Sequence, residues 1–168
     1  LADTETRLVR SANAALQALQ APPIARVADV YETEAVVVCG LPALDAYGAR
    51  SDAEYTGPIN NLDTGAEPVW PAGDGPKVFA YLKGRYAHLE PMLDALRRAP
   101  ARVLVYAAEI PRATVRRFES PTLRFSPAPL RMRSVVAQCD AAVCHGGQTT
   151  DTMLEGGSRV PLMANWPG

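Results

Sequence analysis

Short apolar runs and helically spaced apolar residues alternate along the chain after residue 76. The apolar runs cover 77–82, 102–107, 122–125 and 141–144, and each predicts a buried strand. Apolar residues at helical spacing predict helices over 87–98, 111–119, 130–138 and 149–157. A last apolar run, 160–163, predicts the start of a fifth strand. Strands that alternate with helices imply a parallel sheet with helices on both faces, so we expect an α/β, Rossmann-like fold.

The earlier part of the chain follows a different pattern. Residues 1–20 carry alanine and leucine at helical spacing and predict one amphipathic helix, which ends at the two prolines that follow. A short turn is expected over 26–31 and a strand over 34–40, whereas 45–63 has no clear period.

Residues 65–76 are dense in proline and glycine, which is typical of a linker. This segment divides the chain into a short helix-and-strand piece over 1–64 and a larger domain over 77–168.

The most informative stretch is the end of the run 141–144. The run stops at His145, Gly146 and Gly147, and the next three residues, Gln148, Thr149 and Thr150, lead into a predicted helix. A strand, a glycine turn and a helix start together present free backbone N–H groups and the positive end of a helix dipole. The arrangement predicts a seat for a phosphate or a diphosphate.

Each side chain of this stretch also has a plainer interpretation. The glycines can form an ordinary turn, His145 can be a buried imidazole, and Thr149 and Thr150 can cap the helix. The place of His145 at the carboxyl end of a strand favours a ligand role, because ligands of such sheets bind beyond the strands' carboxyl ends. The loops at 83–84, 107–110 and 126–130 are expected to face the same ligand.

Composition and charge narrow the classes of function. The formal net charge of -1 argues against broad electrostatic binding of DNA or RNA, so phosphate binding must be local. No apolar run is long enough to span a bilayer, and the first residues lack the pattern of a signal peptide. Cys39, Cys139 and Cys144 have no metal-like spacing, so we expect reduced thiols, no bound metal and a cytoplasmic location.

Several familiar motifs are absent from the sequence. The chain has neither Gly-x-x-x-x-Gly-Lys-Ser/Thr nor Gly-x-Gly-x-x-Gly after a strand, and it lacks a Gly-x-Ser-x-Gly nucleophile elbow. With no nucleophile paired to a base, the stretch at 145–150 is interpreted as a binder of a charged group.

The stretch 143–150, followed by Leu154-Glu155-Gly156 and Val160-Pro161, resembles the C-terminal signature of GT-B glycosyltransferases. The similarity is to the branch of UDP-glucosyltransferases and macrolide (antibiotic) glycosyltransferases. Further parts of the resemblance are Gly57-Pro58-Ile59, Phe125 to Leu130, Cys139-Asp140 and Asn165-Trp166-Pro167. It covers most of residues 30–168 and is most specific over 145–161 combined with 125–130.

The resemblance implies a role for each candidate residue. His145, Gly146, Gly147 and Thr150 would hold the diphosphate of a nucleotide sugar, with backbone N–H groups of Gln148 and Thr149 added. Phe125, with Pro127 in the same loop, would cover the base. Glu155 would hold the ribose. It lies two positions later than the acidic residue of the family, and Met153 occupies the position where that acid is expected. No metal or cofactor is implied beyond the donor substrate itself.

The resemblance further implies a hexosyltransferase that moves a sugar to an acceptor hydroxyl on a small molecule, a lipid or a natural product. Residues 1–64 would be the tail of the acceptor domain and 77–168 most of the nucleotide-sugar-binding domain. The family's catalytic base and its sugar-holding acid and Gln have no counterpart in the sequence, so we expect a fragment that is inactive alone. A partner chain, a second copy or residues outside this sequence would cover the apolar surface of the unfinished sheet.

Two alternatives stay open. A nucleotide-sugar epimerase of the same fold would need carboxylates facing the sugar, for which Asp151 and Glu109 are the candidates. A nonenzymatic nucleotide-binding domain would need only the phosphate-binding turn at 145–150.

Overall fold

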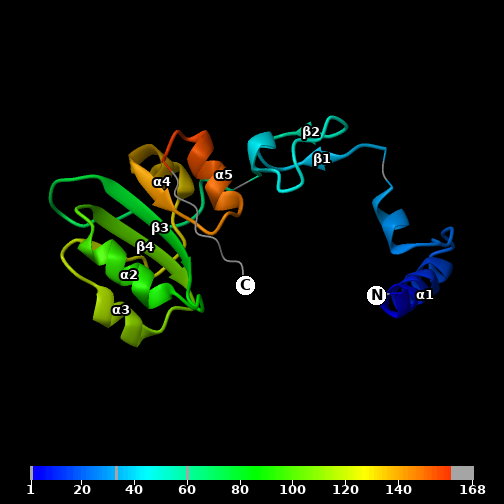
Figure 1. Ribbon diagram of the computed structural model, residues 1–168, viewed down its shortest axis with the longest axis horizontal. Coiled ribbons are helices and arrows are strands. Elements are labelled where there is room, and N and C mark those ends of the chain that lie inside the picture. Colours follow the sequence, from blue (N-terminus) through cyan, green and yellow to red (C-terminus); the bar gives the residue numbers. More distant parts are fainter. Residues whose placement is uncertain (1, 33, 60, 160–168) are drawn as a thin grey trace. The chain divides into compact units, whose positions relative to one another are not determined.

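A computed structural model describes residues 2–32, 34–59 and 61–159 of the protein (Figure 1). The chain separates into two compact units. The first unit contains residues 1–37 and 51–54, and the second contains 38–50 and 55–168. The predicted limits at 64/65 and 76/77 stay predictions.

The first unit is built around helix α1 (Ala2–Ala18), which confirms the predicted N-terminal helix. Asn13 fixes the chain that returns past this helix, because its amide group both donates to the Ile24 carbonyl at 2.9 Å and accepts the Ile24 N–H at 2.8 Å. A short 3-10 helix (Val27–Tyr31) occupies the predicted turn. Leu8 of α1 is 53% exposed.

Two short strands pair in the part of the chain that precedes residue 65. The resulting sheet consists of β1 (Val37–Val38) and β2 (Glu54–Tyr55), and a 3-10 helix (Pro42–Leu44) follows β1. The strand predicted over 34–40 is therefore much shorter than expected. The loop between the strands is held by Asp45, whose carboxylate accepts the Tyr55 hydroxyl at 2.7 Å and pairs with Arg50 at 3.0 Å.

The second unit contains a four-stranded parallel sheet. Its strands are β3 (Lys77–Lys83), β4 (Arg102–Ala108), β5 (Leu123–Phe125) and β6 (Ala141–Val143), in the order β5-β4-β3-β6. The register pairs Lys83 with Ala108 and Ala80 with Val143. All four strands lie where the apolar runs predict them. Strands of a parallel sheet are buried on both faces, so they appear in the sequence as continuous apolar runs that are easy to locate.

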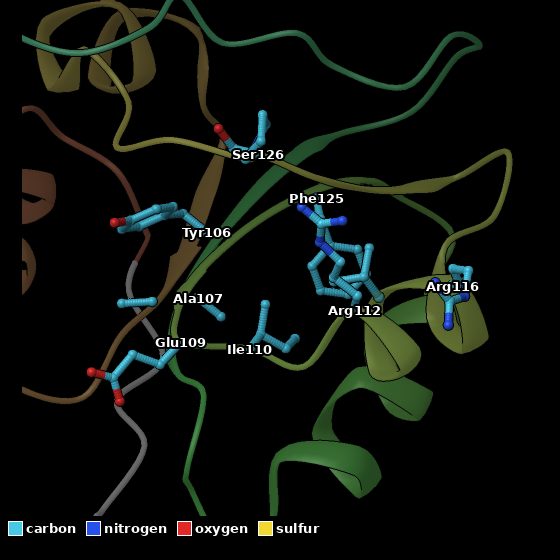
Figure 2. A pocket seen from close by; sticks show the side chains of 11 residues that line it. Tyr106, Ala107, Glu109, Ile110, Arg112, Arg116, Phe125 and Ser126 are labelled. Atoms are coloured by element: carbon cyan, nitrogen blue, oxygen red, sulfur yellow. The ribbon is translucent and has the colours of Figure 1, made fainter.

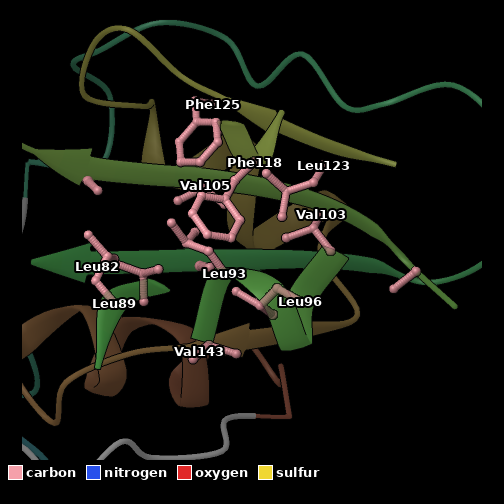
Figure 3. Packing of buried hydrophobic residues seen from close by; sticks show 13 residues of the cluster. Leu82, Leu89, Leu93, Leu96, Val103, Val105, Phe118, Leu123, Phe125 and Val143 are labelled. Atoms are coloured by element: carbon pink, nitrogen blue, oxygen red, sulfur yellow. The ribbon is translucent and has the colours of Figure 1, made fainter. Parts of the chain in front are cut away.

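Helices cover both faces of this sheet, as predicted. Helices α2 (Leu89–Arg98) and α3 (Arg112–Phe118) pack on one face, and α4 (Met132–Gln138) and α5 (Gln148–Glu155) on the other. On the first face, Leu93 of α2 is fully buried in a cluster with Val103 and Val105 of β4 (Figure 3). On the second face, Phe79 and Leu104 pack against Met153 of α5.

The proline- and glycine-rich segment 65–76 runs beside α4 and is tied to it. Ala66 exchanges backbone hydrogen bonds with Pro129 and Arg131, and the Trp70 indole N–H donates to the Gln138 side chain at 3.0 Å. Arg159 forms an isolated parallel bridge with Ala141 of β6. The fifth strand predicted over 160–163, and the motif at 165–167, lie outside the described residues.

The order of the strands fixes where a ligand can bind. Strands β3, β4 and β5 follow one another in one direction across the sheet, and β6 then lies on the opposite side of β3. The loops leaving β3 and β6 therefore diverge to opposite faces of the sheet. A crevice opens at this switch point, beyond the carboxyl ends of the strands, and it is the usual ligand site of such sheets.

Candidate functional site

The turn from β6 to α5 stands at the switch point. Cys144, 1% exposed, is the last core residue of this run, and the backbone then turns at Gly146 with φ +80. Gly147 is the N-cap residue of α5 in an extended conformation, and no side chain caps the helix. A Cβ added at Gly146 or Gly147 would meet nothing within 4 Å, so the outer side of the turn is open.

Several backbone N–H groups of this turn have no partner among the residues that the structure describes. The Thr150 N–H donates to the Gly147 carbonyl at 2.8 Å, which closes the first turn of α5. Within the described residues, the N–H groups of Gly146, Gly147, Gln148 and Thr149 have no acceptor. Together with the positive end of the helix dipole, they form a site that favours an anion.

A cavity of about 370 Å³ opens in front of these groups. Its lining comes from the ends of β3 and β6 and from the turn: Tyr81, Lys83, Cys144, His145, Gly146, Gly147, Gln148 and Thr149. Lys83 is the cation among them, and no carboxylate belongs to this described lining. The positive charge of the cavity is therefore complementary to the negative charge of a phosphate group.

His145 joins the two strands across the switch point. Its Nε2 accepts the backbone N–H of Lys83 at 3.0 Å, and its ring packs edge-on to Tyr86 with centroids 5.2 Å apart. Burial, and then the charge of Lys83, lower the pKa of His145 below its ordinary value of 6.5. The ring is therefore neutral near pH 7 and carries its proton on Nδ1, which is buried and has no partner among the described residues.

The polar residues after the glycines face different surroundings. Gln148 is exposed and Thr149 half-buried, and both line the cavity. The Thr150 side chain is 1% exposed and points into the core, where it lowers the pKa of the neighbouring Cys144 thiol. Burial outweighs that effect and raises the pKa of Cys144 to about 11, so the thiol stays protonated.

A second cavity, of about 560 Å³, lies beyond the ends of β4 and β5. Phe125 and Pro127 line it, as do Tyr106, Glu109 and Arg112 (Figure 2). Phe125 is only 9% exposed, since it also belongs to the core on the α2 and α3 side. The structure thus brings Phe125 and Pro127 together in one cavity and places His145 to Thr149 at another.

Two stacked tyrosines connect the cavities. Tyr81 of β3 lines the smaller cavity and Tyr106 of β4 the larger one, and the two residues are paired in the register of the sheet. Their rings stack with centroids 5.7 Å apart and planes 18° from parallel. Both cavities lie at the carboxyl ends of the strands.

The acidic candidates lie at different places. Glu155, at the end of α5, is exposed and lies beside Gly57; it lines neither cavity. Met153, which stands where the resemblance puts an acid, is fully buried in the core. Asp151 also lines neither of the two cavities, and burial, followed by the charge of Glu155, raises its pKa.

The cavity residues that sequence reasoning did not select are Tyr81, Tyr106 and Arg112, whereas Lys83 lies in the loop at 83–84, which was expected to face the ligand. The rule that ligands bind at carboxyl ends of strands does place Lys83 on the ligand side. The tyrosine pair could not be found from the sequence, because Tyr81 and Tyr106 become neighbours only through the register of β3 against β4.

Comparison of the chain with protein-family models and with curated proteins gives no match. In the described part of the chain, no group of three or more His, Cys, Asp or Glu residues is arranged to hold a metal ion. No helix within 2–32, 34–59 and 61–159 is both long enough and apolar enough to cross a membrane.

Proposed function

We propose that the second unit binds the nucleoside diphosphate of a sugar donor and serves as the donor-binding part of a GT-B hexosyltransferase. The observation that carries the proposal is the β6–α5 turn, with its unpaired N–H groups facing a cavity that contains Lys83 and no described carboxylate. The diphosphate would occupy this cavity. The base would lie in the larger cavity against Phe125, two strands away.

The size and chemistry of the two cavities support this assignment. Unpaired N–H groups at a helix start are suited to phosphate oxygens, whereas the larger cavity offers aromatic and apolar surface from Phe125, Ile110 and Val115. A ligand with an anionic part and a flat apolar part fits both. The resemblance of residues 143–161 to the GT-B signature points to the same ligand class.

The proposed catalytic contribution is electrostatic. When the bond between sugar and diphosphate breaks, negative charge grows on the leaving phosphate. Fixed N–H groups and the Lys83 ammonium already face that position, so the charge is stabilised without rearrangement. The Nδ1–H of His145 is a further donor; it is buried and has no acceptor among the described residues. No side-chain nucleophile is required in this scheme.

Calorimetric titration with UDP, dTDP, GDP and ADP tests the proposal, with the matching nucleosides as controls. We expect at least one diphosphate to bind, and its nucleoside to bind much more weakly, because most polar contacts are made by the diphosphate. Exchanging His145 for alanine should weaken binding by about 1.5–3 kcal/mol, the range for a hydrogen bond to a charged group. The control is His88→Ala, which changes a histidine outside both cavities.

Absence of heat with all four diphosphates would reject the proposal. Binding of a diphosphate without transfer from its sugar conjugate to any acceptor, when tested in the longest natural form of the chain, would favour the nonenzymatic nucleotide-binding alternative.

A further inference from the structure

The larger cavity contains positive charge that the described residues do not neutralise. Arg112 and Arg116 line it from successive turns of α3, and neither side chain has a carboxylate partner in the described part of the chain. The remaining charged residue of this described lining, Glu109, already pairs with Arg85 at 3.3 Å. The N–H groups of the two arginines are therefore available to a ligand in the cavity.

Other arginines on the same face of the sheet are paired. Arg117, next to Arg116 in the sequence, pairs with Glu90 at 2.7 Å. Arg97 at the end of α2 pairs with Asp94 at 3.1 Å. The arginines of the cavity differ from these neighbours in facing a hollow surface without a carboxylate to bind them.

Arg112 reaches toward the aromatic part of the cavity. Figure 2 shows its side chain extending from the start of α3 toward Phe125, whereas Arg116 stands farther along the helix. Phe125 is held in place because it also belongs to the buried core. A flat ring that packs against Phe125 would therefore present an edge to the Arg112 guanidinium. The cavity, of about 560 Å³, has room for a base with two rings.

We propose that Arg112 recognises the base of the bound nucleotide and selects guanine, so that the donor is a guanosine diphosphate sugar; this rests on the proposed function. A guanidinium offers parallel N–H donors and no acceptor, which matches the neighbouring O6 and N7 acceptors of guanine. Adenine and cytosine carry an amino donor at the corresponding place, where it would face the N–H groups of Arg112. Uracil and thymine offer the O4 acceptor there, next to a carbon atom.

Calorimetry with nucleotide analogues tests this assignment at the level of single atoms. We expect GDP to bind about 5- to 100-fold more tightly than ADP, CDP or UDP, the range for one bidentate contact to a base. Inosine diphosphate keeps O6 and N7 and should bind about as tightly as GDP. The diphosphate of 7-deazaguanosine lacks the N7 acceptor and should bind more weakly than GDP.

Substitutions of Arg112 test the same contact from the side of the protein. Arg112→Gln should weaken GDP binding by a similar factor and leave UDP binding nearly unchanged. The ratio of GDP to ADP affinity should fall furthest, because a glutamine amide has a donor and an acceptor that suit adenine. Arg112→Lys keeps the positive charge without the planar fork and should retain only part of the preference for GDP.

Two matched controls separate a defined contact from general charge. Arg124→Gln removes an exposed arginine of β5 that has no carboxylate partner among the described residues and lines neither cavity. Arg117→Gln removes an arginine of α3 that pairs with Glu90. Both variants should keep the preference for GDP. Loss of the preference in Arg124→Gln, to the extent seen in Arg112→Gln, would overturn the inference.

The outcomes distinguish the inference from the function beneath it. Binding of ADP or UDP as tightly as GDP by the unmodified protein, or an unchanged preference in Arg112→Gln, rejects the role of Arg112 and leaves diphosphate binding in place. Failure of every diphosphate to bind rejects both.

Discussion

The two glycines of the β6–α5 turn make different demands on the backbone. Gly146 has φ +80, so alanine there should cost about 1–2 kcal/mol of stability. Gly147 is extended and a Cβ on it would meet nothing, so Gly147→Ala should change the free energy of unfolding by less than about 0.5 kcal/mol. Both methyl groups would stand at the cavity, and both variants should bind a diphosphate more weakly. Urea unfolding and calorimetry measure the two effects.

Gly48 offers a matched control for Gly146. It has φ +83, a Cβ there would also meet nothing within 4 Å, and it lies outside both cavities. Gly48→Ala should therefore lose stability as Gly146→Ala does and keep its affinity for the diphosphate. Unchanged diphosphate affinity in Gly147→Ala would show that the open side of the turn is not where the ligand binds.

His145 makes the stability of the unit depend on pH. Its folded pKa lies below 6.5, so in the window between the two values the unfolded chain takes up a proton that the folded chain does not. The contribution of the neutral ring is present above pH 6.5 and is lost as the pH falls toward the folded pKa. We expect the loss of unfolding free energy between about pH 7 and 5 to be smaller in His145→Gln. An identical pH profile for both proteins would contradict this environment of His145.

At the scale of single residues, the sequence was sufficient to locate the β6–α5 turn but not the side chains that surround it. The glycines and the helix start are local signals, so residues 145–149 could be assigned to one site from the sequence. The burial of Thr150 could not, because it depends on which face of α5 packs on the sheet. The pairing of Tyr81 with Tyr106 depends on strand register, which local patterns do not contain.

At the scale of elements, α2 is held to the sheet mainly by its buried leucines. Leu93 is 0% exposed, so Leu93→Ala should lower the free energy of unfolding by about 2–5 kcal/mol through lost burial and the remaining cavity. Leu19→Ala, just beyond α1 at 75% exposure, is the control and should change it by less than about 0.5 kcal/mol. Equal effects of the two substitutions would mean that α2 does not pack as described.

The strands and helices of the second unit were predictable because each has its own local pattern of apolar residues. All four predicted strands from 77 to 144 and all four predicted helices from 87 to 157 are present, with ends that differ by a few residues. The strand predicted over 34–40 shrank to Val37–Val38. A single short strand gains its stability from its partners, and β2, its partner, offers only two residues.

At the scale of the whole molecule, electrostatic attraction to a phosphate has to be local, because the formal net charge is -1. The two lysines of the chain stand at opposite ends of β3 and provide a matched pair. Lys83 lines the diphosphate cavity, whereas Lys77 lies over the ring of Trp70 at the other end.

Lys83→Gln should weaken diphosphate binding about 3- to 10-fold and reduce its dependence on salt concentration, since an exposed charge contributes through a screened interaction. Lys77→Gln should leave both unchanged. Equal weakening by the two substitutions, measured by calorimetry at two salt concentrations, would point to general charge attraction instead of a defined site.

The central claim is that the start of α5 receives the phosphates, and the backbone amides themselves can report it. In an NMR titration of the labelled protein with UDP, dTDP, GDP and ADP, a diphosphate that binds should shift the amide signals of Gly146, Gly147, Gln148 and Thr149 most strongly. The matching nucleoside should shift signals around Phe125 and leave these four nearly in place. Unmoved signals at these four amides, while a diphosphate binds elsewhere or not at all, would contradict the account.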